Sequence, residues 1–288
     1  SYGSRGLGDV YKRQRLVHCC GFDSVPSDLS VYFLQKHFHE RYGHYASRVS
    51  GRMGRAAGGV SGGTVASLMF VAEQASKDTS IRDTVMDPYA LYPPGMEKGS
   101  DQPDQAGIAW DDDFGSWTGP FVMAAINTKV VRRSHALAGL PYGADFGYDE
   151  SQLCSSRAKA ILSAGGLGTV MAGTFFSPTR ALLNKLLPDP GEGPNKETRD
   201  NGFFEFWAHG TDGENTLRVK VTGQRDPGYG ATSRMLAQAG LCLTQDELAV
   251  GGGIWTPASA LGDALLARLP DVDIHFAVMD EQLSLIHI

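Results

Sequence analysis

The chain has 288 residues, with 26 Lys and Arg against 32 Asp and Glu, which gives a formal net charge of −6. This acidic balance leaves no basic footprint for nucleic acid, and 13 Phe, 10 Tyr and 4 Trp supply enough apolar surface to exclude a disordered chain. Glycine is the outlier, because its 36 residues are nearly double the usual share and follow no collagen or solenoid period. These glycines therefore belong to turns and close backbone approaches.

Both ends of the chain are interpreted as foreign to it. Residues 1–14 show neither a strand period nor a helix period and contain no apolar segment of a signal peptide, and residues 283–288 carry no helix stop signal. Both segments resemble the translated adapter sequence that flanks assembled DNA fragments. The alternative is a native arm and a short final strand. We expect a native stretch of residues 15–282 whose natural amino terminus is missing.

The first native segments predict a strand, a tight loop and a helix. Residues 15–22 form an apolar run that ends near a glycine, as a buried strand does. Ser24 and Pro26 suit the start of a helix, which the apolar spacing extends to about Tyr42, with Gly43 as its stop. This succession is the unit on which nucleotide-binding folds are built.

The rest of the chain alternates further helices and strands. Residues 46–63 show only a Gly- and Arg-rich composition, and residues 83–118 predict a long functional loop or lid. Alternating apolar and polar residues predict a β-hairpin from 204–209 and 217–221. Helices are expected over 64–72, 121–137 and 232–240 and from 256 onward, with a closing strand over 274–278. The fold class is therefore α/β joined to α+β.

Metal and nucleotide motifs are weak. Gly166 and Gly168 are the nearest approach to a dinucleotide fingerprint, but they follow a helical pattern and not a strand. His18, Cys19 and Cys20 alternate between the faces of a strand and cannot converge on one ion, so no metal is expected. Asp111 to Asp113 is interpreted as a solvated loop. Four free thiols without a signal peptide indicate a reducing, cytoplasmic setting.

An uncharged stretch covers residues 160–179. Its length approaches that of a membrane span, but its glycines and modest hydrophobicity argue against one. We expect a buried, bent helical element, with a surface that faces lipid or lines an acyl chain as the alternative.

The segment from Gly21 to Asp28 is the principal candidate for ligand binding. It leaves a buried strand and enters a helix, so its backbone N–H groups point outward from the carboxyl edge of a sheet, where ligands lie in open α/β folds. The other interpretation is an ordinary helix cap. Spacing alone does not separate the two.

Residues 18–29, His-Cys-Cys-Gly-Phe-Asp-Ser-Val-Pro-Ser-Asp-Leu, resemble a signature of the saccharopine dehydrogenase-like oxidoreductases. The branch they resemble includes the bacterial trans-acting enoyl reductases, and the similarity extends over residues 15–280. Further matching segments are 60–64, 120–127, 141–143, 228–230 and 256–258.

The resemblance implies three native regions. Residues 15–45 would be the last strand and helix of a truncated Rossmann domain that binds NAD or NADP, whose pyrophosphate loop is missing. Residues 46–240 would form an α+β substrate domain that caps the nicotinamide. Residues 241–282 would return as a helix and strand toward the Rossmann domain. We expect the fragment by itself to be inactive.

The resemblance also implies roles for individual residues. The cofactor-binding loop would comprise Gly21, Phe22, Asp23, Ser24, Val25, Pro26 and Ser27, with Asp23 or Ser24 bonded to the nicotinamide carboxamide or ribose. Facing it from the substrate domain would be Ser61, Gly62, Gly63 and Thr64. Tyr142 or Tyr229 would donate the proton that completes reduction of an enoyl group.

Three classes of function remain open. The first is an NAD(P)-dependent oxidoreductase acting on lipid-type acyl substrates, cytoplasmic or at the membrane periphery, as a monomer or a homodimer. The second is an amino-acid dehydrogenase of the saccharopine type, in which Arg52 with Arg55, or Arg132 with Arg133, would clamp carboxylates. The third is a non-catalytic lipid-associated scaffold, which exposure of residues 160–179 would favour.

Overall fold

A computed structural model of the chain describes residues 13–59, 62–99, 103–175 and 192–279. Residues 1–12 and 280–288, which include most of the two ends interpreted as foreign, lie outside these ranges, as does Ser61.

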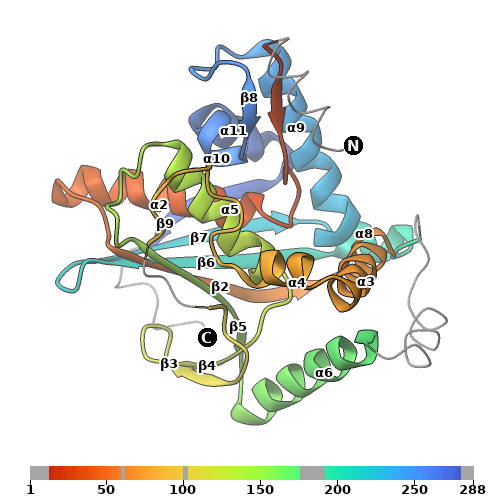
Figure 1. The fold of residues 1–288 in the computed structure, drawn as a ribbon. Coiled ribbons are helices and arrows are strands. Elements are labelled where there is room, and N and C mark those ends of the chain that lie inside the picture. Colours follow the sequence, from red (N-terminus) through yellow and green to blue (C-terminus); the bar gives the residue numbers. More distant parts are fainter. Residues whose placement is uncertain (1–12, 60–61, 100–102, 176–191, 280–288) are drawn as a thin grey trace.

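A mixed β-sheet forms the centre of the described chain (Figure 1). Its strand order is β3-β4-β5-β2-β6-β7-β9; β2 and β5 run parallel, and all other neighbours are antiparallel. The strands are β2 (Arg48–Ala57), β3 (Ala109–Asp111), β4 (Ser116–Gly119), β5 (Gly147–Cys154), β6 (Phe203–Thr211), β7 (Thr216–Gln224) and β9 (Ile274–Met279). The predicted hairpin is confirmed as β6 and β7, and the closing strand as β9.

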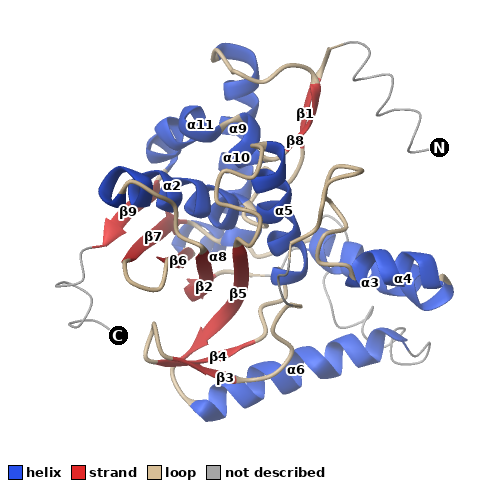
Figure 2. Cartoon of the chain, turned by 60° about the vertical axis from the view of Figure 1, so that its left-hand side comes forward, coloured by secondary structure: helices blue, strands red, loops and turns tan. Residues whose placement is uncertain are grey.

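One face of this sheet is covered by helices (Figures 1 and 2). They are α2 (Val25–Tyr42), α5 (Ala124–Leu137), α9 (Thr232–Gln245), α10 (Pro257–Ala260) and α11 (Gly262–Arg268). From α2, Leu29, Leu34 and Phe38 are fully buried in the same cluster as Phe204 and Phe206 of β6. Each such side chain contributes roughly 1.5–3 kcal/mol by leaving water, so this contact fixes α2 on the sheet. As predicted, α2 ends at Gly43, which has a φ of 80°.

The remaining helices lie around the rest of the sheet. They are α3 (Gly62–Lys77), α4 (Thr79–Met86), α6 (Arg157–Phe175) and α8 (Lys196–Asn201), with the short turns η1 (Pro227–Ala231) and η2 (Leu269–Val272). The expected buried, bent element over residues 160–179 is wrong where it is described. These residues lie in α6, where Ala160 is buried but the Leu162 side chain is 75% exposed. Residues 176–179 lie outside the described ranges.

A separate pair of parallel strands brings the beginning of the described chain beside a segment near its carboxyl-terminal end. β1 (Arg15–Val17) pairs with β8 (Gly253–Trp255), so that Arg15 lies opposite Gly253. The strand predicted over 15–22 is shorter because Cys19 adopts a φ of 61° and the chain turns at Gly21, whose carbonyl accepts from Val25 N–H. The mixed α/β class is thus observed. The assignment of this pair to a Rossmann domain stays a prediction.

Two central strands escaped the sequence patterns. β2 lies in the Gly- and Arg-rich segment for which no element was predicted, and β5 lies beside it. Gly51 of β2 is needed because a Cβ atom there would overlap the Tyr148 hydroxyl and lie 2.9 Å from the Phe206 ring. The prediction of a long loop over 83–118 is also only partly correct, since this range contains the end of α4 together with β3 and β4.

Replacing Gly51 by alanine should destabilise the fold, because two fully buried rings would have to move to admit the methyl group. We expect Gly51→Ala to lower the free energy of unfolding by about 1–3 kcal/mol, measured by urea denaturation. Gly240→Ala in α9 is the control: its Cβ atom meets nothing within 4 Å, and alanine favours a helix. Equal stability of Gly51→Ala and the wild type would contradict this packing.

Candidate functional site

The candidate ligand loop lies between β1 and α2. Ser24 N–H and Val25 N–H both donate to the Gly21 carbonyl, at 3.2 and 2.9 Å, which makes a tight turn directly before the helix. Ser24 occupies the cap position, but its side chain does not cap the helix. Its hydroxyl donates instead to Asn127 Oδ1 of α5 at 3.0 Å. The loop is therefore tied to α5 at its exit.

A buried polar cluster around Glu150 continues this link. Asn127 Nδ2 donates to Ser27 Oγ and to Glu150 Oε1, at 3.1 Å each, and Ser27 Oγ donates to the same carboxylate oxygen at 2.6 Å. Glu150 comes from β5 and is 1% exposed, and its Oε2 has no hydrogen-bond partner among the described residues. Burial raises the pKa of Glu150 to about 7, although the hydrogen bonds from Ser27 and Asn127 oppose that rise.

Asp28, at the end of the same segment, joins three helices. Its Oδ1 accepts from the Ser134 hydroxyl of α5 at 2.5 Å, and its Oδ2 accepts from the Ala258 N–H of α10 at 2.7 Å. The Ser134 hydroxyl also lies 2.6 Å from Thr256 Oγ1. Burial raises the pKa of Asp28 to about 7, opposed by these two hydrogen bonds. Asp28 thus fastens the carboxyl-terminal segment to the first helix.

The segment therefore has an inward part and an outward part. Ser24, Val25, Pro26 and Ser27 are buried, whereas Asp23 is exposed and Gly21 and Phe22 are partly exposed. Ser24 and Ser27 bond to protein groups, so a cofactor would meet the backbone and the Asp23 side chain first. The cofactor role of the seven residues stays a prediction.

The loop meets the start of α3 through η1. Phe22 N–H donates to Thr232 Oγ1 at 3.0 Å, and this hydroxyl donates to the Pro227 carbonyl at 2.8 Å. The backbones at Gly228 and Gly59 lie so close that a Cβ atom on Gly228 would be 2.7 Å from the Gly59 carbonyl oxygen.

The predicted substrate-facing segment follows Gly59. Gly62, Gly63 and Thr64 form the first turn of α3, and Gly62 N–H donates to the Glu192 carbonyl at 3.0 Å. The two predicted segments thus lie on either side of η1. Ser61 falls outside the described residues.

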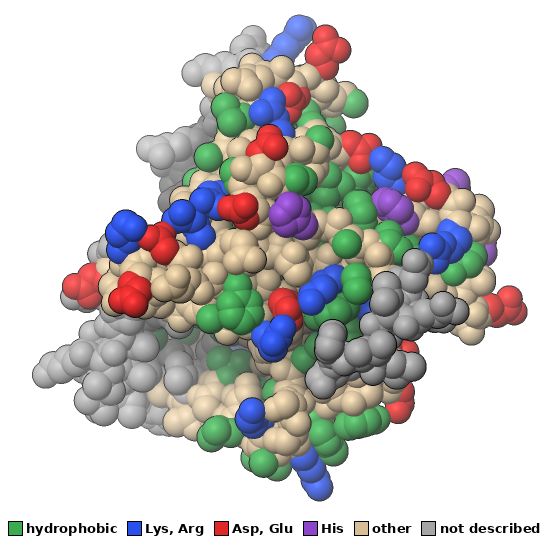
Figure 3. All heavy atoms as spheres, turned by 180° about the vertical axis from the view of Figure 1, so that it is seen from behind, with side chains coloured by type: hydrophobic (Ala, Val, Ile, Leu, Met, Phe, Trp, Pro, Cys, Tyr) green, Lys and Arg blue, Asp and Glu red, His purple; other side chains and the backbone are tan. Residues whose placement is uncertain are grey.

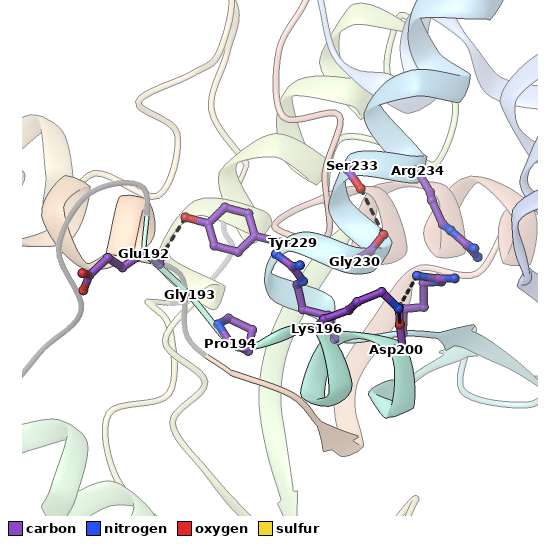
Figure 4. Close-up of a pocket in the computed structure, with 11 residues that line it drawn as sticks. Glu192, Gly193, Pro194, Lys196, Asp200, Tyr229, Gly230, Ser233 and Arg234 are labelled. Carbon is purple, nitrogen blue, oxygen red and sulfur yellow. Dashed lines mark hydrogen bonds and ion pairs between the residues drawn. The ribbon is translucent and has the colours of Figure 1, made fainter.

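The two tyrosines predicted as proton donors line different cavities. Tyr229 lines a cavity of about 920 Å³ and donates to the Glu192 carbonyl at 3.1 Å (Figure 4). Tyr142 lines a cavity of about 630 Å³ and stacks on His135, with the ring centroids 4.9 Å apart. Burial raises the pKa of Tyr142 above the ordinary value for tyrosine. The structure does not bring the two hydroxyls to one site, so at most one of them acts on a given substrate.

The arginine pairs considered as carboxylate clamps are bound within the protein. Arg52 contacts two carboxylates at 2.6 Å each, and Arg55 pairs with a third at 3.0 Å; these belong to Asp111, Asp149 and Glu205. Arg132 and Arg133 donate to backbone carbonyls of other segments. Asp111 is consequently a buried ion-pair partner and not part of a solvated loop.

Two residues of this site were not singled out from the sequence. Asn127 belongs to a matching segment but was given no role, and Glu150 was not recognised at all. Residues 147–152 of β5 carry polar side chains on both faces, so no alternation marks Glu150 as inward-facing. Within the described ranges, no three His, Cys, Asp or Glu are grouped so as to hold a metal ion. No described helix is long and apolar enough to cross a membrane.

The two raised carboxyl pKa values give the fold a pH dependence. When the pKa of a carboxyl group is higher in the folded than in the unfolded chain, the group stabilises the fold most at a pH below its pKa in the unfolded chain. That stability is lost as pH rises toward and through its pKa in the folded chain. For Glu150 and Asp28 this interval runs from about pH 4 to pH 7.

Replacing Glu150 by glutamine should remove part of this dependence, because an amide oxygen still accepts from Ser27 and Asn127 but carries no charge at any pH. We expect the wild type to lose unfolding free energy between pH 4 and pH 7, and Glu150→Gln to lose less, both measured in urea. Glu214→Gln, at an exposed carboxyl, is the control and should behave as the wild type. The same loss in Glu150→Gln and the wild type would refute the assignment.

Comparison with known proteins adds the family. No protein-family model matches the chain. A Mycobacterium tuberculosis protein provisionally named as a trans-acting enoyl reductase is 38% identical over 285 residues, which cover 91% of this chain and 68% of that protein. The trans-acting enoyl reductase of Mycobacterium bovis is 36% identical over 92% of this chain and 69% of its own length. That of Mycobacterium ulcerans is 34% identical over the same shares. The chain therefore belongs to the family of trans-acting enoyl reductases.

Proposed function

We propose that this chain takes part in reducing the carbon–carbon double bond of an enoyl thioester, with NADPH or NADH as the hydride donor and a lipid-type acyl group as the substrate. The observation that carries the proposal is the position of Gly21 to Asp23, partly or fully exposed beyond the carboxyl end of a parallel strand pair and directly before a helix. Ligands of open α/β sheets lie at that edge. The names of the relatives support the same reaction.

The residues present fit the nicotinamide end of such a cofactor. Asp23 offers an exposed carboxylate to the carboxamide or ribose, and the turn at Gly21 keeps the backbone close to the helix start. A Cβ atom on Gly21 would lie 2.8 Å from the Thr232 methyl group, so only glycine lets the loop pass the start of α9 this closely. The described residues contain no strand followed by a glycine-rich phosphate loop, so the fit concerns this end alone.

The substrate needs hydrogen-bond donors and one proton. When bound, a reduced nicotinamide would supply a hydride to the β-carbon, and the electron pair of the double bond would move to the thioester oxygen. In this proposal the N–H group of Gly63, in the first turn of α3, faces the resulting enolate. Backbone donors fixed at a helix start stabilise such charge without rearranging. A tyrosine then protonates the α-carbon, which completes the reduction.

Asp23 is the residue whose removal tests the cofactor site. NADPH affinity is measured by fluorescence for this chain and for the same chain joined to the additional residues that its relatives carry. We expect Asp23→Ala to weaken binding to the extended protein by about tenfold, the usual effect of losing one hydrogen bond to a charged group. Asp113→Ala, which removes another exposed carboxylate, is the control. Unchanged affinity in Asp23→Ala would remove Asp23 from the site.

The two tyrosines are separated by their phenylalanine variants. The hydroxyl is the only group lost in Tyr142→Phe and Tyr229→Phe, and the two residues line different cavities. In the extended protein, we expect one variant to lower kcat for an enoyl thioester by about 10²–10⁴-fold with little change in KM, and the other to retain near-normal kcat. Near-normal turnover in both variants would show that the proton comes from another group.

A further inference from the structure

The larger cavity has an excess of basic side chains. Four basic and two acidic residues line it, and the acidic ones are Glu192 and Asp200. The basic residues are Lys196, Arg199, Arg225 and Arg234. The chain as a whole carries a net charge of −6, and on the face shown in Figure 3 acidic and basic side chains are interspersed. A pocket of opposite sign in such a chain concentrates anions locally. We call this cavity the basic pocket (Figure 4).

Internal ion pairs leave part of this charge unneutralised. The Asp200 carboxylate forms ion pairs with both Lys196 Nζ and Arg225 Nη1, each at 2.5 Å, so one negative charge is shared by two cations. The pKa of Asp200 is lowered, chiefly by the hydrogen bond from Lys196, so Asp200 is ionised at neutral pH. The guanidinium of Arg199 is exposed and its charge also acts on Asp200, so a single carboxylate faces three cations. Arg199 and the shared cations therefore remain available to an anionic ligand.

The backbone conformation at Arg225 indicates that this position requires an arginine side chain. Arg225 has a φ of 75°, a conformation that glycine adopts freely and that the Cβ atom of other residues disfavours. It lies between β7 and the buried Asp226, where the chain turns into η1. A glycine would make that turn with less strain. An arginine in this position instead directs a guanidinium toward Asp200 at the wall of the basic pocket.

We propose that the basic pocket binds a phosphate ester, held by Lys196, Arg199 and Arg225. Guanidinium and ammonium groups bind phosphate oxygens through short charge-assisted hydrogen bonds, and arginine does so with two parallel donors. The cavity, of about 920 Å³, has room for more than the phosphate itself. Its wall at Tyr229 and Gly230 belongs to η1, which is followed directly by Thr232, the α9 residue that the candidate ligand loop contacts.

The ligand can be named from the reaction, and this step rests on the proposed function. Two participants in the reduction of an enoyl thioester carry phosphate esters: the carrier arm of the thioester and the nicotinamide dinucleotide. Both present the same chemistry to the basic pocket, so competition has to distinguish them. The binding of phosphate itself does not depend on the reaction, and a failed reduction assay would leave that binding intact.

The test is direct binding of inorganic pyrophosphate, followed by ³¹P NMR at low ionic strength with the full chain. We expect Lys196→Ala combined with Arg199→Ala to weaken binding by at least about tenfold, since charge-assisted hydrogen bonds are lost. Both side chains are exposed, so the fold should persist. Arg82→Ala, which removes an exposed cation from α4, is the matched control and should bind as the wild type. Added salt should weaken wild-type binding through screening.

Arg225→Gly separates a binding role from a structural one. Glycine relieves the positive φ, so we expect unchanged or higher thermal stability together with weaker pyrophosphate binding. Displacement of pyrophosphate by coenzyme A or by NADPH then identifies the source of the phosphate, and either result supports the proposal. Absent pyrophosphate binding, or equal binding by the double variant and the wild type, would overturn it.

Discussion

The structure depends on a short row of buried polar groups in the first turn of α2. Ser27 and Asp28 point away from solvent and bond to β5, α5 and α10, which are far apart in the sequence. Burying a carboxylate without a cation is unfavourable unless hydrogen bonds compensate. Asp28 has two such bonds and Glu150 accepts two on a single oxygen, so each acid is satisfied differently. Burial raises the pKa of both carboxyl groups to about 7, so each keeps its proton to near neutral pH.

This row also positions the candidate ligand loop. Because Ser24 is held by Asn127, and Asn127 by Glu150, the exit of the loop has one fixed orientation relative to the sheet. The entry is held by Phe22, whose N–H bonds to Thr232 and whose ring packs edge-on against Phe204 at 4.9 Å. Only the tip, at Asp23, is exposed between two anchored ends. A loop of this kind presents its backbone without having to become ordered when a ligand binds.

The sequence predicted the parts of the fold that rest on local signals. Helix α2 has a proline at its start and Gly43 at its end, and the β6–β7 hairpin alternates apolar and polar residues, so each could be recognised within its own segment. Strand β2 could not, because Gly51 is required by rings from two other strands. The Glu150 cluster was equally hidden, since its three members, Ser27, Asn127 and Glu150, come from three elements that only the folded chain brings together. The exposure of α6 contradicts an expectation based on its uncharged sequence, because absence of charge says nothing about which neighbours are present.

A signature segment can therefore combine two constraints of different origin. In residues 18–29 the serines and Asp28 make hydrogen bonds to buried groups, and these bonds within the protein explain why the side chains are polar. Asp23 satisfies no interior partner among the described residues and lies at the surface. The two kinds of residue follow one another within a few positions of the chain, so a family signature contains both residues that could touch a ligand and residues that serve the interior. Burial separates them: loss of an inward group leaves its partners unsatisfied and acts first on stability, whereas loss of the outward carboxylate leaves the fold intact.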